Sequence, residues 1–361
     1  MDAPISLIGL SLFELENLLP DIPRYRAKQI YKWIIRGAAG FEEMSDIPKI
    51  LQKQLQERFC LFSSAVSALC EDGETKKIVL TLKDGLKIES VLLNDGKDRL
   101  TACISTQAGC PVGCVFCKTG SIGFKRNLTS GEIIEQYSHL LRISDKSSGK
   151  DAQTRREEKS LKEHIIDNIV VMGMGEPLLN LSSLRKAIEI LNDKSGFNFS
   201  KRRITVSTCG ICEELFDIAS NGPYIRLALS LVTADETLRR KLMPAAKNNP
   251  LDTVHKALVL FQKNSGGRLT LEIPLLGGIN TREKDAKSIA DFAKNLDTVV
   301  NIIPWNKVDG LLFENVQLEE PAKNETNNFI KALENYGLNV TVRLHKGQGI
   351  MGACGQLGSS A

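Results

Sequence analysis

The chain has 361 residues, of which 42% are hydrophobic and 25% are charged, and its Lys and Arg residues exceed its Asp and Glu residues by 47 to 43. This composition is typical of a globular protein, and the length allows one barrel-sized domain and a small accessory domain. A membrane-spanning protein is excluded, because no stretch approaches about 18 uninterrupted apolar residues. The small charge excess is only weak evidence for a polyanionic partner.

The nine cysteines are an odd number, and residues 1–20 contain acidic residues but no basic segment typical of a secretory signal. A disulfide framework is therefore a poor interpretation of the cysteines. We expect a cytoplasmic protein whose thiols stay reduced and available to a metal.

The first predicted elements are helices. Leu12, Leu15, Leu18 and Leu19 have helical spacing, and further helical patterns follow up to residue 59. We predict a helical accessory domain over residues 1–62. From residue 66 the pattern changes to short alternating runs at 77–82 and 86–93, joined by Lys83-Asp84-Gly85, which indicates a hairpin. Residues 63–98 are predicted to be a strand extension or linker.

The rest of the chain, residues 99–361, alternates predicted strands with segments of helix length. The strands are expected at 101–106, 167–174, 203–208, 225–231, 269–275, 298–304 and 339–344. This alternation predicts an α/β fold with a parallel sheet that closes into a partial or full (β/α) barrel. Reactive side chains should gather at the carboxyl ends of the strands.

Residues 144–162 interrupt this pattern. They are highly charged and contain almost no large apolar residue. We expect an exposed, mobile insertion between a helix and a strand.

Three cysteines form the most informative motif. Cys110, Cys114 and Cys117 have the spacing C-x3-C-x2-C in a Gly-rich loop after the predicted strand at 101–106. Three thiolates can hold a [4Fe-4S] cluster that usually takes four, which leaves one iron open to a small chelating ligand such as S-adenosylmethionine (SAM). A structural zinc site, with a fourth cysteine or a histidine from elsewhere in the chain, is the alternative.

Small polar residues follow several predicted strands. Gly175 and Glu176 end an apolar run, and Ser207, Ser230 and Asn306 end later strands. Glycine lets a ligand approach the backbone, and the carboxylate, hydroxyls and amide could bind an ammonium group or a ribose. Each residue alone is equally typical of an ordinary turn.

Two further thiols differ from the triplet. Cys103 lies on the strand that leads into the cysteine loop, and a buried, inert core thiol is its simplest interpretation. Cys354 lies in a C-terminal segment of small residues, so its sulfur is predicted to be exposed and reactive at the mouth of the barrel.

Taken together, these motifs resemble the radical-SAM RNA adenine methyltransferases, the RlmN and Cfr group, over nearly the whole chain. The segments that carry the resemblance, in this order, are Cys103 to Cys110, the cysteine triplet, Gly123-Phe124, Arg126 to Thr129, Met172 to Asn180, Ser207-Thr208, Met243-Pro244, Ile303 to Asn306 and Ala353 to Leu357.

The resemblance implies a radical-SAM barrel that carries a [4Fe-4S] cluster on the triplet, and a methyl group that travels through Cys354. Cys354 would take a methyl group from one SAM, and a second SAM would be cleaved reductively to generate a carbon radical that adds to the base. Cys103 would then attack the sulfur of Cys354 and form a disulfide as the product leaves.

By its match to the family, Glu89 would remove the ring proton, although its spacing to Cys103 is one residue longer than usual. Without the resemblance, Glu89 would be interpreted as a solvent-facing strand carboxylate. The SAM-contact positions of the family fall on Gly175, Glu176, Ser207, Ser230, Leu231, Val232 and Asn306. The chain departs from the family at Val232, where a histidine is usual, and at Gly349, where an acidic stretch is usual.

The resemblance implies methylation of adenine C2 in 23S rRNA, with tRNA as a second candidate substrate. It also implies an RNA-binding role for the N-terminal helices, an electron donor such as flavodoxin or ferredoxin, and a monomer without membrane contact. Methylation at C8, as in the Cfr branch, is the nearest alternative. A non-catalytic iron-sulfur protein that binds RNA is another, and a radical-SAM enzyme for a small molecule would leave Cys354 without a role.

Overall fold

The computed structural model describes residues 5–73, 75–95, 99–146, 166–343 and 346–358. Most of the charged insertion predicted at 144–162 lies outside the described residues.

The N-terminal part is helical, as the leucine spacing predicts. Its elements are α1 (Leu12–Leu18), α2 (Arg24–Ile35), the 3-10 turn η1 (Phe41–Glu43) and α3 (Lys49–Arg58). Ser11 begins α1 through a capping box, in which its hydroxyl accepts a hydrogen bond from the N–H of Glu14 and the Glu14 carboxylate accepts one from the N–H of Ser11. Strands β1 (Ile5–Ser6) and β2 (Phe59–Cys60) pair in parallel and join the two ends of this part.

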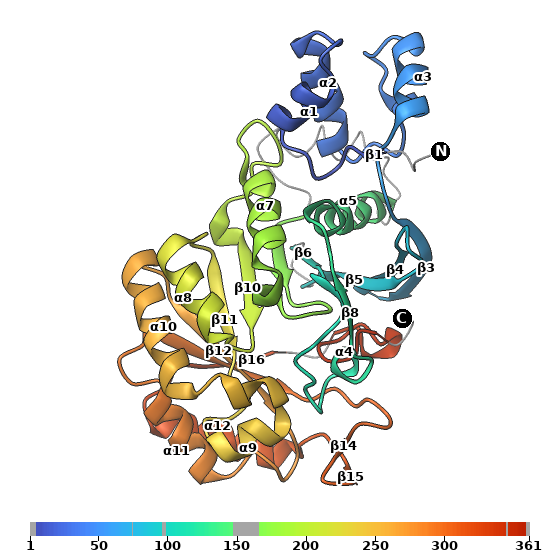
Figure 1. Ribbon diagram of the computed structural model, residues 1–361. Coiled ribbons are helices and arrows are strands. Elements are labelled where there is room, and N and C mark those ends of the chain that lie inside the picture. The colour runs from blue at the N-terminus through green and yellow to red at the C-terminus, as the bar shows by residue number, and fades with distance from the viewer. Residues whose placement is uncertain (1–4, 74, 96–98, 147–165, 344–345, 359–361) are drawn as a thin grey trace.

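A ten-stranded sheet forms the centre of the molecule, in the order β16-β13-β12-β11-β10-β9-β6-β5-β4-β3 (Figure 1). Its parallel strands are β6 (Leu100–Cys103), β9 (Asn168–Val171), β10 (Ile204–Thr208), β11 (Arg226–Ser230), β12 (Leu269–Leu275), β13 (Thr298–Pro304) and β16 (Val340–Val342). All seven predicted strands are present. Among the described residues β16 pairs only with β13, so the barrel is partial rather than closed.

Three antiparallel strands extend the sheet beyond β6. They are β3 (Ala65–Asp72), β4 (Thr75–Thr81) and β5 (Lys87–Asn94), and β5 pairs directly with β6. The hairpin predicted around Lys83-Asp84-Gly85 therefore forms. The segment 63–98 joins the same sheet as the parallel strands.

Helices connect the parallel strands and cover the sheet, because each crossover between parallel strands returns on the same side. They are α5 (Ser130–Lys146), α7 (Leu181–Asn192), α8 (Cys212–Asn221), α9 (Glu236–Leu242), α10 (Leu251–Ser265), α11 (Glu283–Phe292) and α12 (Lys323–Asn335). Short elements complete the chain: α4 (Lys118–Ser121), η2 (Pro177–Asn180), η3 (Lys201–Arg203), η4 (Pro244–Asn248), η5 (Gln348–Ile350), and the antiparallel pairs β7 (Gln107–Gly109) with β8 (Phe124–Asn127) and β14 (Leu312–Phe313) with β15 (Val316–Gln317).

The C-terminal tail, residues 346–358, bridges the two ends of the curved sheet. On one side Nδ2 of Asn306, just after β13, donates a hydrogen bond of 2.9 Å to the carbonyl of Cys354. On the other side Nζ of Lys77, on β4, donates one of 3.3 Å to the carbonyl of Met351. The tail thereby covers the open side of the partial barrel.

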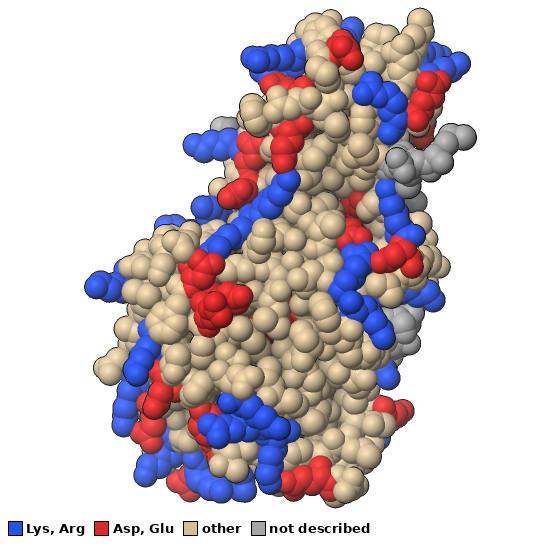
Figure 2. Space-filling model, in the orientation of Figure 1, with Lys and Arg blue, Asp and Glu red and all other residues tan. Residues whose placement is uncertain are grey.

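Basic side chains gather on two parts of the face shown in Figure 2. One group lies over the region of β8 and the other over the region of α9, with a mostly uncharged area between them. Lys125 on β8 and Arg240 and Lys241 on α9 are exposed. In the described part of the chain, no helix is both long and apolar enough to cross a membrane.

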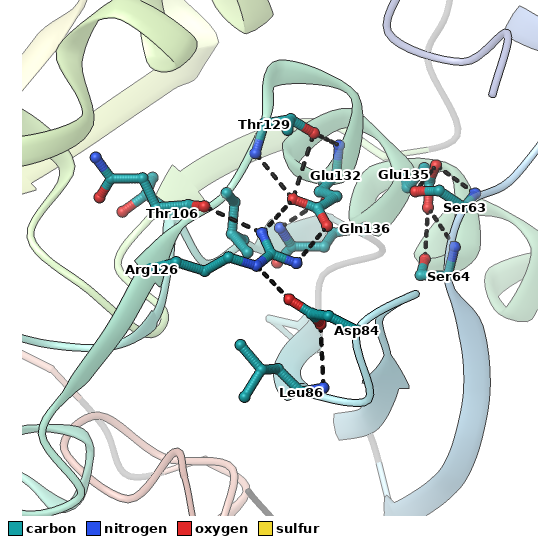
Figure 3. Close-up of polar contacts among 12 residues, drawn as sticks. Ser63, Ser64, Asp84, Leu86, Thr106, Arg126, Thr129, Glu132, Glu135 and Gln136 are labelled. Carbon is teal, nitrogen blue, oxygen red and sulfur yellow. Dashed lines mark hydrogen bonds and ion pairs between the residues drawn. The ribbon is translucent and has the colours of Figure 1, made fainter. Parts of the chain in front are cut away.

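A buried carboxylate connects the helical part to the barrel (Figure 3). Glu135 on α5 accepts hydrogen bonds of 2.5 to 2.9 Å from the backbone N–H groups and hydroxyls of Ser63 and Ser64, the residues between the helical part and β3. One turn earlier, Glu132 binds Arg126 of β8 through both guanidinium Nη atoms, and Arg126 also pairs with Asp84 of the hairpin. Helix α5 therefore fixes both the interdomain segment and the strand beside the cysteine loop.

Candidate functional site

The cysteine triplet lies in the loop between β7 and α4, and its three residues line a cavity of about 170 Å³ at the carboxyl ends of the strands. The loop is fixed by its backbone: the N–H of Cys110 donates to the carbonyl of Gly123 at 3.2 Å, and the N–H of Cys117 donates to the carbonyl of Cys114 at 3.2 Å. Gly109 precedes the loop with φ of +76°, and a Cβ there would lie 1.8 Å from the Gly123 oxygen. Only glycine fits this approach.

The donor set of this cavity fits an iron-sulfur cluster. Burial raises the pKa of Cys110 to about 12 and the pKa values of Cys114 and Cys117 above their ordinary value, so metal binding must displace their protons. Within the described ranges, no three Cys, His, Asp or Glu side chains converge on a single metal ion. A cube differs from zinc in this respect, because each thiolate binds its own iron.

Gly175 and Glu176, predicted as cofactor contacts, line the same cavity. Gly175 has φ of +104°, and a Cβ there would lie 2.6 Å from the side chain of Gln107. The buried Glu176 carboxylate accepts hydrogen bonds from the hydroxyl of Thr208 at 2.7 Å and from the N–H of Cys209 at 2.8 Å. Burial raises the pKa of Glu176, although these hydrogen bonds lower it. Glu176 therefore ties the end of β9 to the end of β10 at the cavity wall.

Ser207 and Ser230 also line the cavity, with their hydroxyl oxygens 3.3 Å apart. The Ser207 hydroxyl donates a hydrogen bond of 2.7 Å to Oε2 of Glu272, a buried carboxylate on β12. Together they form a row of hydrogen-bonding groups on neighbouring strands, suited to hydroxyl or amino groups of a ligand. Glu272 was missed in the sequence, because it stands in the middle of an apolar strand rather than at its end.

The structure brings together only some of the other predicted SAM contacts. Asn306 lines the cavity and holds the tail. Leu231 and Val232 are fully buried, and neither is among the described residues that line this cavity. Val232 packs against the hydrophobic cluster behind the cysteine loop and has φ of +65°, an unusual conformation for a β-branched residue.

A second cavity of about 650 Å³ lies inside the barrel, and Cys103 lines it. Cys354 and Arg343 line both cavities and so stand where the two meet. Burial and the nearby Cys354 raise the pKa of the Cys103 thiol to about 12, and Arg343 opposes this shift. The two thiols predicted to react with each other therefore lie in one neighbourhood, with an arginine beside them.

Arg343 was missed in the sequence, since one arginine at the end of a predicted strand carries no distinctive signal. Cys354 and Glu272 raise the pKa of its guanidinium, and Nη1 lies 3.8 Å from the sulfur of Met172.

Glu89 is fully buried, unlike the solvent-facing carboxylate that the strand pattern alone indicates. It lies on the same face of the sheet as Cys103, because β5 pairs Val91 with Cys103 and side chains two residues apart on a strand share a face. Its Oε2 lies 3.6 Å from Nζ of Lys77 and accepts a hydrogen bond from the N–H of Gly358. Glu89 is not among the described residues that line either cavity.

Two protein-family models match parts of the chain. Residues 104–293 match the Radical SAM superfamily, and residues 5–61 match the "Ribosomal RNA large subunit methyltransferase N-terminal domain".

Full-length relatives share these parts. A protein of Treponema denticola named "Probable dual-specificity RNA methyltransferase RlmN" is 45% identical over 99% of this chain and 96% of its own length. Proteins with the same name from Treponema pallidum and Dictyoglomus turgidum are 39% and 37% identical, over 99% and 98% of this chain and 98% and 96% of their own lengths. The crystal structure of a radical SAM methyltransferase from Sphaerobacter thermophilus superposes with a TM-score of 0.88 at 35% identity, covering 98% of this chain and 99% of that one.

Proposed function

This chain belongs to the RlmN family of radical-SAM RNA methyltransferases, and on that premise we propose that it methylates C2 of an adenine in 23S rRNA, with tRNA as a second substrate. The observation that carries the proposal is the position of Cys354. Cys354 lines both the cavity of the cysteine triplet and the larger cavity that Cys103 lines. A methyl carrier needs such a position, because it must meet the methyl donor first and the acceptor base afterwards.

The residues that would hold the cofactor and SAM follow from the first cavity. Cys110, Cys114 and Cys117 would ligate the [4Fe-4S] cluster, which when bound supplies the electron that cleaves SAM. The backbone at Gly175 and the hydroxyls of Ser207 and Ser230 would bind SAM beside it.

Cys354 would act as the nucleophile that takes a methyl group from SAM by displacement, with S-adenosylhomocysteine as the leaving group. Cleavage of a second SAM would give a deoxyadenosyl radical, which removes a hydrogen atom from this S-methyl group. The methylene radical left on the sulfur of Cys354 would then add to C2 of the target base. Cys354 would then link protein and RNA through one carbon. Arg343, which lines the cavity beside both thiols, would favour the thiolate form of Cys103.

Cys103 would resolve this adduct: its thiolate attacks the sulfur of Cys354, the bond from that sulfur to the methylene carbon breaks, and a disulfide forms. The methylene would take up a proton and become the methyl group, and the unpaired electron of the adduct would pass back to the cluster held by the triplet. Glu89 would accept the proton lost from C2. The second cavity, which contains Cys103 and opens beside Arg99 and Lys346, has a volume in the range of ligand pockets, so an extruded nucleotide could enter there.

The RNA would bind through its phosphates to the two basic groups of Figure 2. Lys125 on β8 and Arg240 and Lys241 on α9 are exposed and are the side chains proposed to contact it. We propose that a protein electron carrier such as flavodoxin or ferredoxin reduces the cluster, that the protein acts as a monomer, and that it works in the cytoplasm, where its nine thiols remain reduced.

The decisive experiment expresses the chain in a bacterial strain that lacks its own adenine-C2 methyltransferase. Mass spectrometry of 23S rRNA and tRNA should show 2-methyladenosine with the wild-type chain and none with Cys354→Ala. A product methylated at C8 would instead assign the chain to the alternative reaction. Unmodified RNA from cells that contain the cluster-loaded protein would reject the proposal.

A further inference from the structure

Arg239, on α9, is fully buried and has no ion pair with any residue that the structure describes. Its Nη2 donates a hydrogen bond of 2.6 Å to the carbonyl of Cys209, and its Nε donates one of 3.3 Å to the carbonyl of Leu231. Its Nη1 is also buried and has no hydrogen-bond partner in the described part of the chain. A buried guanidinium without an ion pair is costly, and the carboxylate of Glu236 on the same helix offsets this cost from beyond ion-pair distance.

The helix that carries Arg239 also braces the cysteine loop. The N–H of Val115, between the second and third cysteines of the triplet, donates to the carbonyl of Leu242 at 3.0 Å. Two residues further on, Pro244 packs on Gly113. The side chains of Leu242 and Met243 belong to the same hydrophobic cluster as Val112 and Phe116 of the loop. Arg239 therefore lies on an element that directly contacts the loop of the triplet.

The guanidinium also lies beside the cavity of the triplet. The carbonyl that its Nη2 binds belongs to Cys209, which lines that cavity together with Cys110, Cys114 and Cys117. Burial lowers the pKa of Arg239, while Cys209 and Glu236 are the first of the groups that raise it.

We propose that Arg239 is the buried counter-charge of the iron-sulfur cluster and raises its reduction potential. The inference rests on the assignment of the triplet as cluster ligands. Three thiolates give a [4Fe-4S] cluster a net negative charge, and reduction makes it more negative. A fixed cation nearby stabilises the reduced form more than the oxidised form, so the cluster accepts an electron more readily. The same charge would compensate the otherwise unpaired guanidinium.

The test is the midpoint potential of the cluster in the full-length protein, reconstituted anaerobically and titrated with a redox dye series while the reduced cluster is followed by electron paramagnetic resonance. Arg239→Met removes the charge and keeps most of the volume. We expect the midpoint potential of Arg239→Met to be more negative than that of wild type. At a fixed solution potential, the ratio of reduced to oxidised cluster should fall on the order of tenfold, which corresponds to a shift of about 59 mV for a one-electron couple.

Arg240→Met is the matched control. It removes the neighbouring arginine of the same helix, whose side chain is 48% exposed and pairs with Glu236 at 3.7 Å. Water screens this charge, so the potential should stay at the wild-type value. Arg239→Lys keeps the charge but loses the fork of the guanidinium, and its potential should lie close to wild type.

A wild-type potential in Arg239→Met, with full iron content, overturns the proposal. If Arg239→Met fails to assemble a cluster, Arg239→Lys decides: a wild-type potential supports the proposal, and a negative shift shows that the hydrogen bonds rather than the charge matter. Absence of any cluster in the wild-type protein would instead refute the assignment of the triplet.

Discussion

The backbone N–H of Gly358 donates a hydrogen bond of 2.9 Å to Oε2 of Glu89. One end of this bond is the C-terminal tail that carries Cys354, and the other is the carboxylate proposed to accept the ring proton. In this arrangement Glu89 faces the tail and Lys77 rather than a cavity. The tail must therefore shift from Glu89 before the carboxylate can reach a substrate.

Glu89→Gln should separate the two half-reactions. Glutamine has the shape of glutamate and can still accept the hydrogen bond from Gly358, but it cannot take up a proton at neutral pH. We expect RNA methylation to slow by about 10²- to 10⁴-fold, the usual contribution of a general base. S-methylation of Cys354, measured by mass spectrometry of the protein, should continue. Glu71→Gln, on the exposed strand β3, is the control, and RNA methylation at the wild-type rate in Glu89→Gln would refute this role.

Asn306→Ala should release the tail. The substitution removes the hydrogen bond to the Cys354 carbonyl and the one that Asn306 accepts from Gln348 at 3.0 Å. Losing partly buried hydrogen bonds of this kind costs about 0.5 to 1.5 kcal/mol each. We expect slower S-methylation of Cys354 and faster cleavage of the tail in limited proteolysis. Asn335→Ala, at an exposed position of α12, should change neither. Unaltered proteolysis of Asn306→Ala would show that other contacts suffice to hold the tail.

Glu135→Ala should destabilise the protein by about 3 kcal/mol, because four donors of Ser63 and Ser64 lose a charged acceptor in a buried place (Figure 3). Urea denaturation followed by circular dichroism measures the free energy of unfolding. Glu283→Ala removes an exposed carboxylate from α11 and should leave stability within about 0.5 kcal/mol of wild type. Equal stability of the two variants would contradict the importance of this connection.

His139 should make stability depend on pH. It is buried on α5 beside Phe62, and burial together with Arg142 lowers its pKa to about 4, whereas in the unfolded chain it is about 6.5. The unfolded state therefore binds the proton first, so this contribution is complete above about pH 6.5 and is lost as the pH falls towards 4. Between pH 7 and pH 5 the loss should be about 2 kcal/mol more in wild type than in His139→Gln, measured by urea denaturation. Identical losses in both proteins would show that His139 is not responsible.

The parallel part of the sheet could be predicted from the sequence, because its strands are short apolar runs that are largely buried. Residues 269–275 and 298–304 form β12 and β13 with the predicted bounds. The short pairs β7–β8 and β14–β15 were not predicted, since segments of two to four residues have no measurable periodicity.

The site was predictable where chemistry requires a rare residue at a fixed spacing, as in the cysteine triplet. It was less predictable where function depends on contacts between distant segments. Nothing near Arg239 in the sequence shows that its guanidinium reaches the carbonyls at the ends of β10 and β11. Nor does the residue pattern around Val232 show that its side chain packs in the hydrophobic cluster that includes Val112 and Phe116 of the cysteine loop.

The way the tail is held has a practical consequence for anyone who wishes to purify this protein. The carbonyl of Leu357 accepts a hydrogen bond of 2.7 Å from the hydroxyl of Thr119, and the carbonyl of Gly355 accepts one of 2.8 Å from the N–H of Lys118, so the tail rests on the helix that follows the cysteine loop. An affinity tag fused to the C-terminus would begin close to these contacts and could displace Cys354, the proposed methyl carrier. The first described strand, β1, lies instead at the junction with α5, where the hydroxyl of Ser6 donates a hydrogen bond to Glu135, so a tag at the N-terminus would not begin at these tail contacts.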